Sequence, residues 1–292
     1  MQAGACPRNV TCGCLDCFRS FSPQIQQSRR FRGTIEPMKL TILGCSGSVP
    51  VPGNAASGYV VSFPDAPSIV MDMGPGTLAR LQEVQDPCDA HITFSHLHAD
   101  HCLDFPSLMV WRRFHPTAPA ASRNFCIGPE HAPRHLGRLS ADEVDGVDDM
   151  SDTFAFSPWI DRERQLLDDV YMTPFRVIHP VEAYALRMEH AKTGKTIAYS
   201  GDTAFTPALV DAARGADVFL CEAAWGETSE GKAPNMHMSG AEAGRVAREA
   251  GVAKLVLVHL QPWGDTAATL RAAQAEFKGE IILGAPGMEF EL

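Results

Sequence analysis

The feature that constrains this chain most is the segment HLHADH, which begins at His96 and places three histidines and one aspartate within six residues. It directly follows residues 90–94 (AHITF), a short β-rich run that predicts a strand. His96 and His98 are two residues apart and can point the same way from an extended strand end, whereas Asp100 and His101 fall on the turn beyond. Packing these groups together is costly unless a cation compensates for their desolvation. Imidazole and carboxylate ligands favour zinc, manganese or iron over calcium.

Three further candidate ligands follow in order along the chain. His179 lies in the segment VIHPVEAY, Asp202 in YSGDT, and His259 at the end of the apolar run LVLVH. A single histidine at a strand end is usually an ordinary polar residue, so none of the three is informative alone. Their order after the histidine-rich segment indicates one shared site.

This succession of motifs resembles the metallo-β-lactamase superfamily, and VIHPVEAY is similar to the third motif of its RNase Z-like branch. The resemblance implies an α/β protein with the αββα sandwich, in which two mixed β-sheets are flanked by helices. It also implies two divalent metal ions, with Zn²⁺ favoured and Mn²⁺ as the alternative. One ion is expected on His96, His98 and His179, and the other on Asp100, His101 and His259. Asp202 is expected to bridge them together with a hydroxide.

Two more residues resemble a catalytic pair of RNase Z-like phosphodiesterases. In that branch a histidine, here His237, protonates the leaving oxygen while a glutamate, here Glu222, holds it. General acid catalysis of this kind contributes about 10²–10⁴-fold to a rate. We expect Asp100 to help orient the attacking water, and Asp72 to support the metal-binding loop. The alternative for His237 is a helix-capping neighbour without a catalytic role.

The chain from residue 38 to 292 resembles the actinobacterial branch of atypical class II cyclic-nucleotide phosphodiesterases. The stretches that suggest it are GCSGS at 44–48, HLHADHCLD at 96–104, VWRR at 110–113 and DVFLCEA at 217–223. The resemblance implies hydrolysis of 3′,5′-cyclic nucleotides, cAMP foremost, to 5′-nucleotides. Ala99 departs from the HxHLDH form of the class II signature without touching a ligand.

Other functions remain open on the same motifs. They are an RNase Z-like nuclease or other phosphodiesterase, a lactone or thioester hydrolase, and a non-enzymatic relative of the fold. Against precursor tRNA, only 22 residues separate His179 from Asp202, which leaves no room for the basic arm of the tRNA-processing enzymes. The intact ligand set argues against the non-enzymatic alternative.

Candidate substrate contacts follow the metal-binding segment or lie in the first turn. Trp111 could stack on a base, and Arg112 and Arg113 could neutralise a phosphate. The alternative is that Trp111 packs on the core while the arginines are solvated. Ser46 could border the pocket, or serve only the turn that contains it.

Composition limits the partners. The formal net charge of -10 disfavours a large nucleic acid as partner, but a small anionic phosphodiester stays compatible because bound cations would dominate the local field. No apolar run approaches the length that spans a membrane. A homodimer is compatible with the resemblance, and the sequence does not decide it.

Residues 1–37 differ from the rest of the chain. They contain four of the nine cysteines, Cys6, Cys12, Cys14 and Cys17. The spacing lacks a second, separated CxxC pair, so we expect a disordered leader, or a start upstream of a more natural Met38, rather than a zinc site. This leader has no apolar core of a secretory signal, and the other cysteines are isolated, so we expect a cytoplasmic protein with one hydrolase domain at 38–292.

Residue patterns predict the elements of that domain. We expect strands at 39–43, 57–62, 68–71, 90–94, 171–179, 182–189, 196–200, 218–221, 254–259, 281–283 and 288–292. We expect helices at 77–82, 205–213, 241–250 and 267–277. Residues 117–165 are rich in Pro, Asp and Ser and give weak signals.

Overall fold

Two seven-stranded sheets organise the chain in the computed structural model, which describes residues 38–292. The first sheet has the order β14-β1-β2-β3-β4-β5-β6. Its strands are β1 (Lys39–Gly44), β2 (Gly58–Ser62), β3 (Ser68–Met71), β4 (Ala90–Thr93), β5 (Asn124–Gly128), β6 (Phe154–Pro158) and β14 (Glu289–Glu291). The second has the order β13-β12-β11-β10-β9-β8-β7. Its strands are β7 (Gln165–Leu167), β8 (Val170–Arg176), β9 (Tyr184–His190), β10 (Thr196–Tyr199), β11 (Val218–Glu222), β12 (Lys254–Val258) and β13 (Glu280–Leu283).

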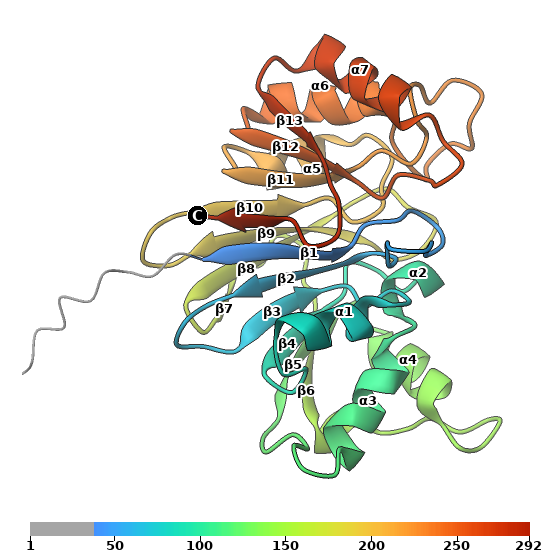
Figure 1. Cartoon of the computed structure of the whole chain (residues 1–292), viewed down its shortest axis with the longest axis vertical. Helices are drawn as coiled ribbons and strands as arrows, with labels where there is room; N and C mark the ends of the chain where they lie inside the picture. The colour runs from blue at the N-terminus through green and yellow to red at the C-terminus, as the bar shows by residue number, and fades with distance from the viewer. Residues whose placement is uncertain (1–37) are drawn as a thin grey trace, which may run out of the picture. The chain divides into compact units, whose positions relative to one another are not determined.

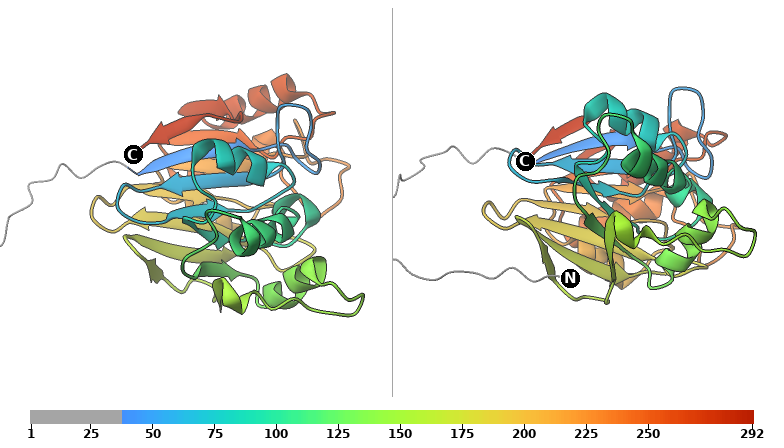
Figure 2. Two further views of the ribbon diagram at one scale, coloured as in Figure 1. Left: turned by 60° about the horizontal axis from the view of Figure 1, so that its bottom comes forward. Right: turned by 90° about the horizontal axis from the view of Figure 1, so that it is seen from below.

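Both sheets are mixed. Strands β3 to β6 are parallel, as are β10 to β13, while β1, β2 and β7 to β9 join by antiparallel pairing. Figure 2 shows the blue and cyan strands of the first sheet stacked against the yellow and orange strands of the second. Parallel strands carry their carboxyl ends to one edge of a sheet, which is where open α/β sheets bind ligands.

Helices cover the outer face of each sheet (Figure 1). The first sheet carries α1 (Thr77–Val84), α3 (Phe105–Phe114) and α4 (Ala132–Ser140), and the second carries α5 (Pro207–Ala213), α6 (Gly240–Ala250) and α7 (Thr266–Glu276). A single helical turn, α2 (Ala99–Cys102), and a 3₁₀ turn (Met150–Asp152) complete the set. This layering is the predicted αββα sandwich.

Three apolar layers hold the sandwich together. Strand β1 shows why: Leu40 and Ile42 point into the layer between the sheets, whereas Leu43 belongs to the layer under α1 and α3. The third layer packs small residues of α5 and α6, such as Ala243, against Phe219 of β11. Buried strands with apolar residues on both faces are typical of sheets covered on both sides.

Most predicted elements are confirmed within a residue or two. Ser239 and Glu242 form the capping box of α6, and Gly251 ends that helix in the left-handed conformation at φ 65°. The predictions missed β5, β6 and α4, because the segment 117–165 mixes turn residues with short apolar runs. They also missed the helix α3 and the short β7, and they assigned a turn where α2 forms. The predicted leader lies outside the described residues.

No helix within residues 38–292 combines the length and hydropathy that a bilayer-spanning segment needs.

Candidate metal centre

The predicted ligands come from both sheets and meet at one edge. His96 and His98 follow β4, and His179 follows β8. Asp202 follows β10 and His259 follows β12, so the second sheet supplies these two ligands and His179, while the first sheet supplies those that follow β4. Two groups of neighbouring side chains result: His96, His98 and His179 in the first, and Asp100, His101, Asp202 and His259 in the second.

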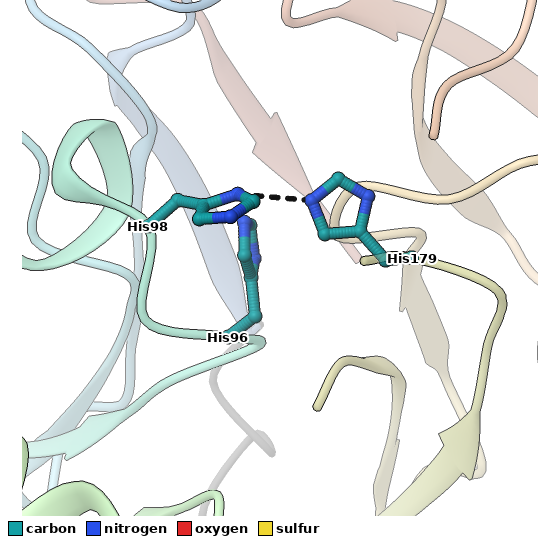
Figure 3. A group of neighbouring side chains, drawn as sticks. All are labelled: His96, His98 and His179. Carbon is teal, nitrogen blue, oxygen red and sulfur yellow. Dashed lines mark hydrogen bonds between the residues drawn. The ribbon is translucent and has the colours of Figure 1, made fainter. Parts of the chain in front are cut away.

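The first group consists of three imidazoles that face one another (Figure 3). His98 Nδ1 lies 3.0 Å from His179 Nε2, while His179 Nδ1 lies 2.8 Å from the carbonyl oxygen of Met236. If His179 donates its Nδ1 proton to that carbonyl, its Nε2 presents a lone pair to the group. Burial lowers the pKa of His96 and His98, and it lowers that of His179 to about 4. Neutral imidazoles of this kind are metal ligands.

The second group is built around the Asp202 carboxylate. His259 Nε2 lies 3.2 Å from Asp202 Oδ2, and His101 Nε2 lies 3.3 Å from Oδ1. Asp100 Oδ2 lies 3.6 Å from His101 Nε2 and 3.7 Å from His259 Nε2. Burial favours the neutral acid, but the neighbouring His259 and His101 outweigh it and hold the pKa of Asp202 well below its usual range.

Asp202 also joins the two groups, because its Oδ2 lies 3.8 Å from His96 Nε2 of the first. Four ligand atoms at this junction are buried without a hydrogen-bond partner: His96 Nε2, His101 Nε2, His259 Nε2 and Asp202 Oδ1. A buried polar atom without a partner costs about 1–3 kcal/mol, so several converging on one point need a shared partner. Divalent cations satisfy imidazole lone pairs and carboxylate oxygens together, and the residues fit the predicted metal ions.

Asp72 braces the metal-binding loop, as expected. Its Oδ2 accepts hydrogen bonds from Ser95 Oγ and Tyr199 OH, each at 2.7 Å, and lies 2.8 Å from His101 Nδ1. Its Oδ1 accepts from the Ser95 N–H at 2.7 Å. Burial lowers the pKa of His101, but the Asp202 and Asp72 carboxylates outweigh it and raise that pKa well above its ordinary value. The two carboxylates therefore favour positive charge at this point of the centre, which a bound cation would supply.

The Glu222–His237 pair lies beside Asp202. His237 Nδ1 lies 3.0 Å from Glu222 Oε1 and 3.7 Å from Asp202 Oδ2. Burial disfavours the protonated ring, but the charge of Glu222 and its hydrogen bond prevail and raise the pKa of His237 to about 9. The structure brings both members of the pair beside Asp202, where the Glu222 carboxylate favours the protonated form of His237.

Comparison with known proteins agrees with this geometry. A family model for the β-lactamase superfamily domain matches residues 68–260, more than half of the chain. The chain belongs to this superfamily. It is a metallo-hydrolase by the same relationship, and the superfamily fold together with the His/Asp groups implies divalent metal binding.

Relatives of this superfamily member cover most of its length. The protein ML1173 of Mycobacterium leprae is 44% identical over 260 residues, which are 89% of this chain and 90% of that protein. The probable metallo-hydrolase YhfI of Bacillus subtilis is 27% identical over 87% of this chain and all of that protein. The crystal structure of YhfI superposes with a TM-score of 0.76, covering 88% of this chain and 100% of that one at 24% identity. Ribonuclease Z of Kineococcus radiotolerans is 27% identical over 84% of this chain and 91% of that protein.

The predicted substrate contacts on α3 are not at this centre. Arg112 is 1% exposed, and its guanidinium donates to Thr153 Oγ1 and Asn124 Oδ1 at the amino-terminal edge of β5 and β6. Arg113 is held by Asp148 and Asp152. The structure therefore contradicts the prediction for both arginines, because α3 starts at the metal-binding loop and its ten residues run about 15 Å away from it.

Trp111 and Ser46 have local roles instead. The ring of Trp111 stacks on His115 at 4.5 Å between centroids, near the same far end of α3. Trp111 is half-buried against a residue at the end of its own helix and Arg112 is buried, so the alternative of a Trp111 on the core with solvated arginines is not found either. Ser46 pairs with Leu260, one residue beyond His259. The Ser46 hydroxyl donates to the Val49 carbonyl at 2.6 Å, so it stabilises the turn that contains it.

Sequence patterns missed several neighbours of the centre. The Trp225 ring meets His237 edge to face at 4.8 Å. The pKa of His135, on α4, is lowered by burial first, then by His131 and then by His98. Ser57 contacts His259 from the turn before β2. None of these residues belongs to a recognisable motif, although Trp225 lies only three residues after Glu222.

Proposed function

We propose that this metallo-hydrolase cleaves a small phosphodiester, and that its substrates are 3′,5′-cyclic nucleotides, cAMP foremost, converted to 5′-nucleotides. The observation that carries the proposal is the hydrogen-bonded Glu222–His237 pair beside Asp202. A phosphodiester has an alkoxide leaving group that gains from a proton donor, and a histidine with a pKa of about 9 is protonated at neutral pH.

The residues that would hold the cations fall into two sets. His96, His98 and His179 form one set, while Asp100, His101 and His259 form the other, with Asp202 shared. Two divalent cations, Zn²⁺ favoured and Mn²⁺ the alternative, supply Lewis acidity and lower the pKa of water. Asp100 is partly exposed, so its carboxylate can accept a hydrogen bond from the attacking water and orient it.

His237 supplies the proton. The attacking water loses one proton to the solvent, its oxygen bonds to phosphorus, and the bond from phosphorus to the 3′ oxygen breaks. His237 donates a proton to that oxygen as it departs. Because Nδ1 is committed to Glu222, Nε2 is the nitrogen left to transfer the proton. Glu222 acts through His237: it also accepts from the N–H groups of Thr203 and Ala224, which keep its carboxylate in place.

The same motifs leave an RNase Z-like nuclease as the second candidate. It is favoured by the similarity to Ribonuclease Z, whose name describes an enzyme that cleaves RNA, a polymer of phosphodiesters. Against a large RNA stands the segment between His179 and Asp202, which the β9–β10 hairpin fills. The net charge of -10 also opposes a long polyanion. A small anionic diester therefore remains the proposed partner.

A substrate panel tests the proposal. The full chain, loaded with Zn²⁺ or Mn²⁺, is offered 3′,5′-cAMP, 2′,3′-cAMP, a short RNA and a lactone at equal concentrations. We expect 3′,5′-cAMP to give 5′-AMP with the highest kcat/KM. Preferred cleavage of RNA would support the second candidate, and preferred lactone hydrolysis would contradict phosphodiester specificity.

A further inference from the structure

Ser57 contacts three separate parts of the metal centre. It is fully buried, in the turn that leads into β2. Its N–H donates to the Asp100 carbonyl at 3.2 Å, and its own carbonyl accepts from the Gly74 N–H at 2.9 Å. Its hydroxyl oxygen lies 3.0 Å from His259 Nδ1. The backbone of Ser57 thus ties together the two loops that carry Asp100 and Asp72, which leaves its hydroxyl as the group directed at a ligand ring.

His259 depends on outside contacts for its ring orientation. It is a non-glycine residue in the left-handed region, at φ 55°, where a side chain is disfavoured unless its surroundings hold it. Its Nε2 is buried without a hydrogen-bond partner and faces Asp202. For Nε2 to present a lone pair, the proton of the neutral ring must sit on Nδ1, and the Ser57 hydroxyl is the acceptor there.

Other ligand histidines have different partners for the same purpose. His101 Nδ1 faces the Asp72 carboxylate, His96 Nδ1 faces Ser95 Oγ, and His179 Nδ1 faces a backbone carbonyl. Such partners fix the tautomer and ring plane of a ligand, and losing one costs about 10- to 100-fold in metal affinity or activity. The hydroxyl of Ser57 contacts His259 alone within this set, so its influence falls on one half of the centre.

We propose that Ser57 is a positioning residue that sets the tautomer and ring plane of His259, and thereby retains the metal ion held by Asp100, His101 and His259. The inference rests on the two-ion centre of the proposed function, and it is independent of which substrate the centre cleaves. The other ion, which His96, His98 and His179 would hold, is expected to be retained without Ser57, because the Ser57 hydroxyl faces His259 and none of these three rings.

Metal release measures this directly. The full chain is loaded with Zn²⁺, and release of each ion to an excess of a chromogenic chelator is followed in time. In Ser57→Ala we expect one of two ions to leave about 10- to 100-fold faster than in the unaltered chain, with the second unchanged. Ser57→Cys, which is close to serine in shape but whose thiol is a weak acceptor, is expected to release the same ion early. Ser57→Thr keeps the hydroxyl and is expected to restore slow release.

Ser68→Ala is the matched control. Ser68 is also buried, and its hydroxyl donates to the Asp89 carbonyl at 3.1 Å. Asp89 precedes β4, so this contact lies at the opposite end of that strand from His96 and His98. It is expected to release both ions at the unaltered rates. Unchanged release in both Ser57→Ala and Ser57→Cys, or equal acceleration of both ions together with a lowered Tm, would overturn the proposal. The release assay does not depend on cAMP turnover. A failure of the proposed substrate can therefore be distinguished from a failure of the proposed role of Ser57.

Discussion

The Glu222 carboxylate lies 3.0 Å from His237 Nδ1, and both residues lie beside Asp202 of the metal centre. Glu222 is fully buried, and the N–H groups of Thr203, Ala224 and Met238 also donate to its two oxygens. A carboxylate anchored in this way keeps its charge at a fixed place. It therefore fixes both the orientation and the protonation state of His237.

Replacing His237 is expected to remove the proton donor and leave the metal ions in place. For His237→Ala we expect kcat on 3′,5′-cAMP to fall about 10²–10⁴-fold, with two ions still bound per chain. Steady-state kinetics and metal analysis of the same preparation check this. A diester with a much better leaving group, such as a nitrophenyl ester, needs little protonation, so its rate is expected to fall less. Equal losses on both substrates would contradict the acid role.

The pH profile is expected to report the same histidine. Because the pKa of His237 is raised to about 9, its acid form persists below that pH and is lost as the pH rises through it, so kcat should decline on the alkaline side. Glu222→Gln removes the charge that raises this pKa, so the decline should move to lower pH. Glu249→Gln, at an exposed glutamate paired with Arg245, is the control and should leave the profile unchanged. An alkaline limb that stays in place in Glu222→Gln would contradict the pairing.

Metal removal is expected to lower stability as well as activity. The unpartnered buried atoms of His96, His101 and Asp202 have no other acceptor or donor, so a cation that binds the folded state stabilises it. At 100 times its dissociation constant, such a ligand adds about 2.7 kcal/mol to the free energy of unfolding. Thermal unfolding of the chelated chain with and without added Zn²⁺ measures the shift. Asp202→Ala should show a much smaller one, and an equal shift would place the ions elsewhere.

The buried guanidinium of Arg112 predicts a loss of stability without a loss of substrate binding. It also donates to the carbonyls of Cys88 and Ser122, which Arg112→Met would leave without this donor. Unmet buried groups cost about 1–3 kcal/mol each, so we expect a loss of about 3 kcal/mol in denaturant unfolding. KM for cAMP should not change. Arg113→Ala, on the next residue, should cost less because its ion pairs with Asp148 and Asp152 are partly exposed. A raised KM in Arg112→Met would restore the substrate-contact hypothesis.

The metal ligands were predictable because four of them lie within six residues and the other three follow in a fixed order along the chain. Three histidines and an aspartate within six residues have few explanations, and His179, Asp202 and His259 each end or follow a strand whose apolar pattern is clear. The sheet topology then brings these strand ends together, as the family resemblance implies. Strands such as β12 were found for the same reason: a buried parallel strand reads as an unbroken apolar run.

What the sequence could not show are contacts between distant segments. In the sequence Arg112 looks like a phosphate ligand beside Trp111 and Arg113. The helical period, however, turns Arg112 inward, while Arg113 stays nearer the surface. Ser57 carries no motif, and its role depends on a contact between the two sheets, because Ser57 precedes β2 of the first sheet and His259 follows β12 of the second. Strands β5 and β6 are short and lie among turn residues, so tertiary pairing rather than local pattern defines them.

The most direct test of the central claim is cAMP hydrolysis by the zinc- or manganese-loaded full chain, measured together with metal content, beside Asp202→Ala and His237→Ala. The account predicts release of 5′-AMP by the unaltered chain with two ions bound, its loss in Asp202→Ala, and a decline of about 10²–10⁴-fold in His237→Ala with both ions retained. Two bound ions without turnover of cAMP, or full turnover in His237→Ala, would contradict it.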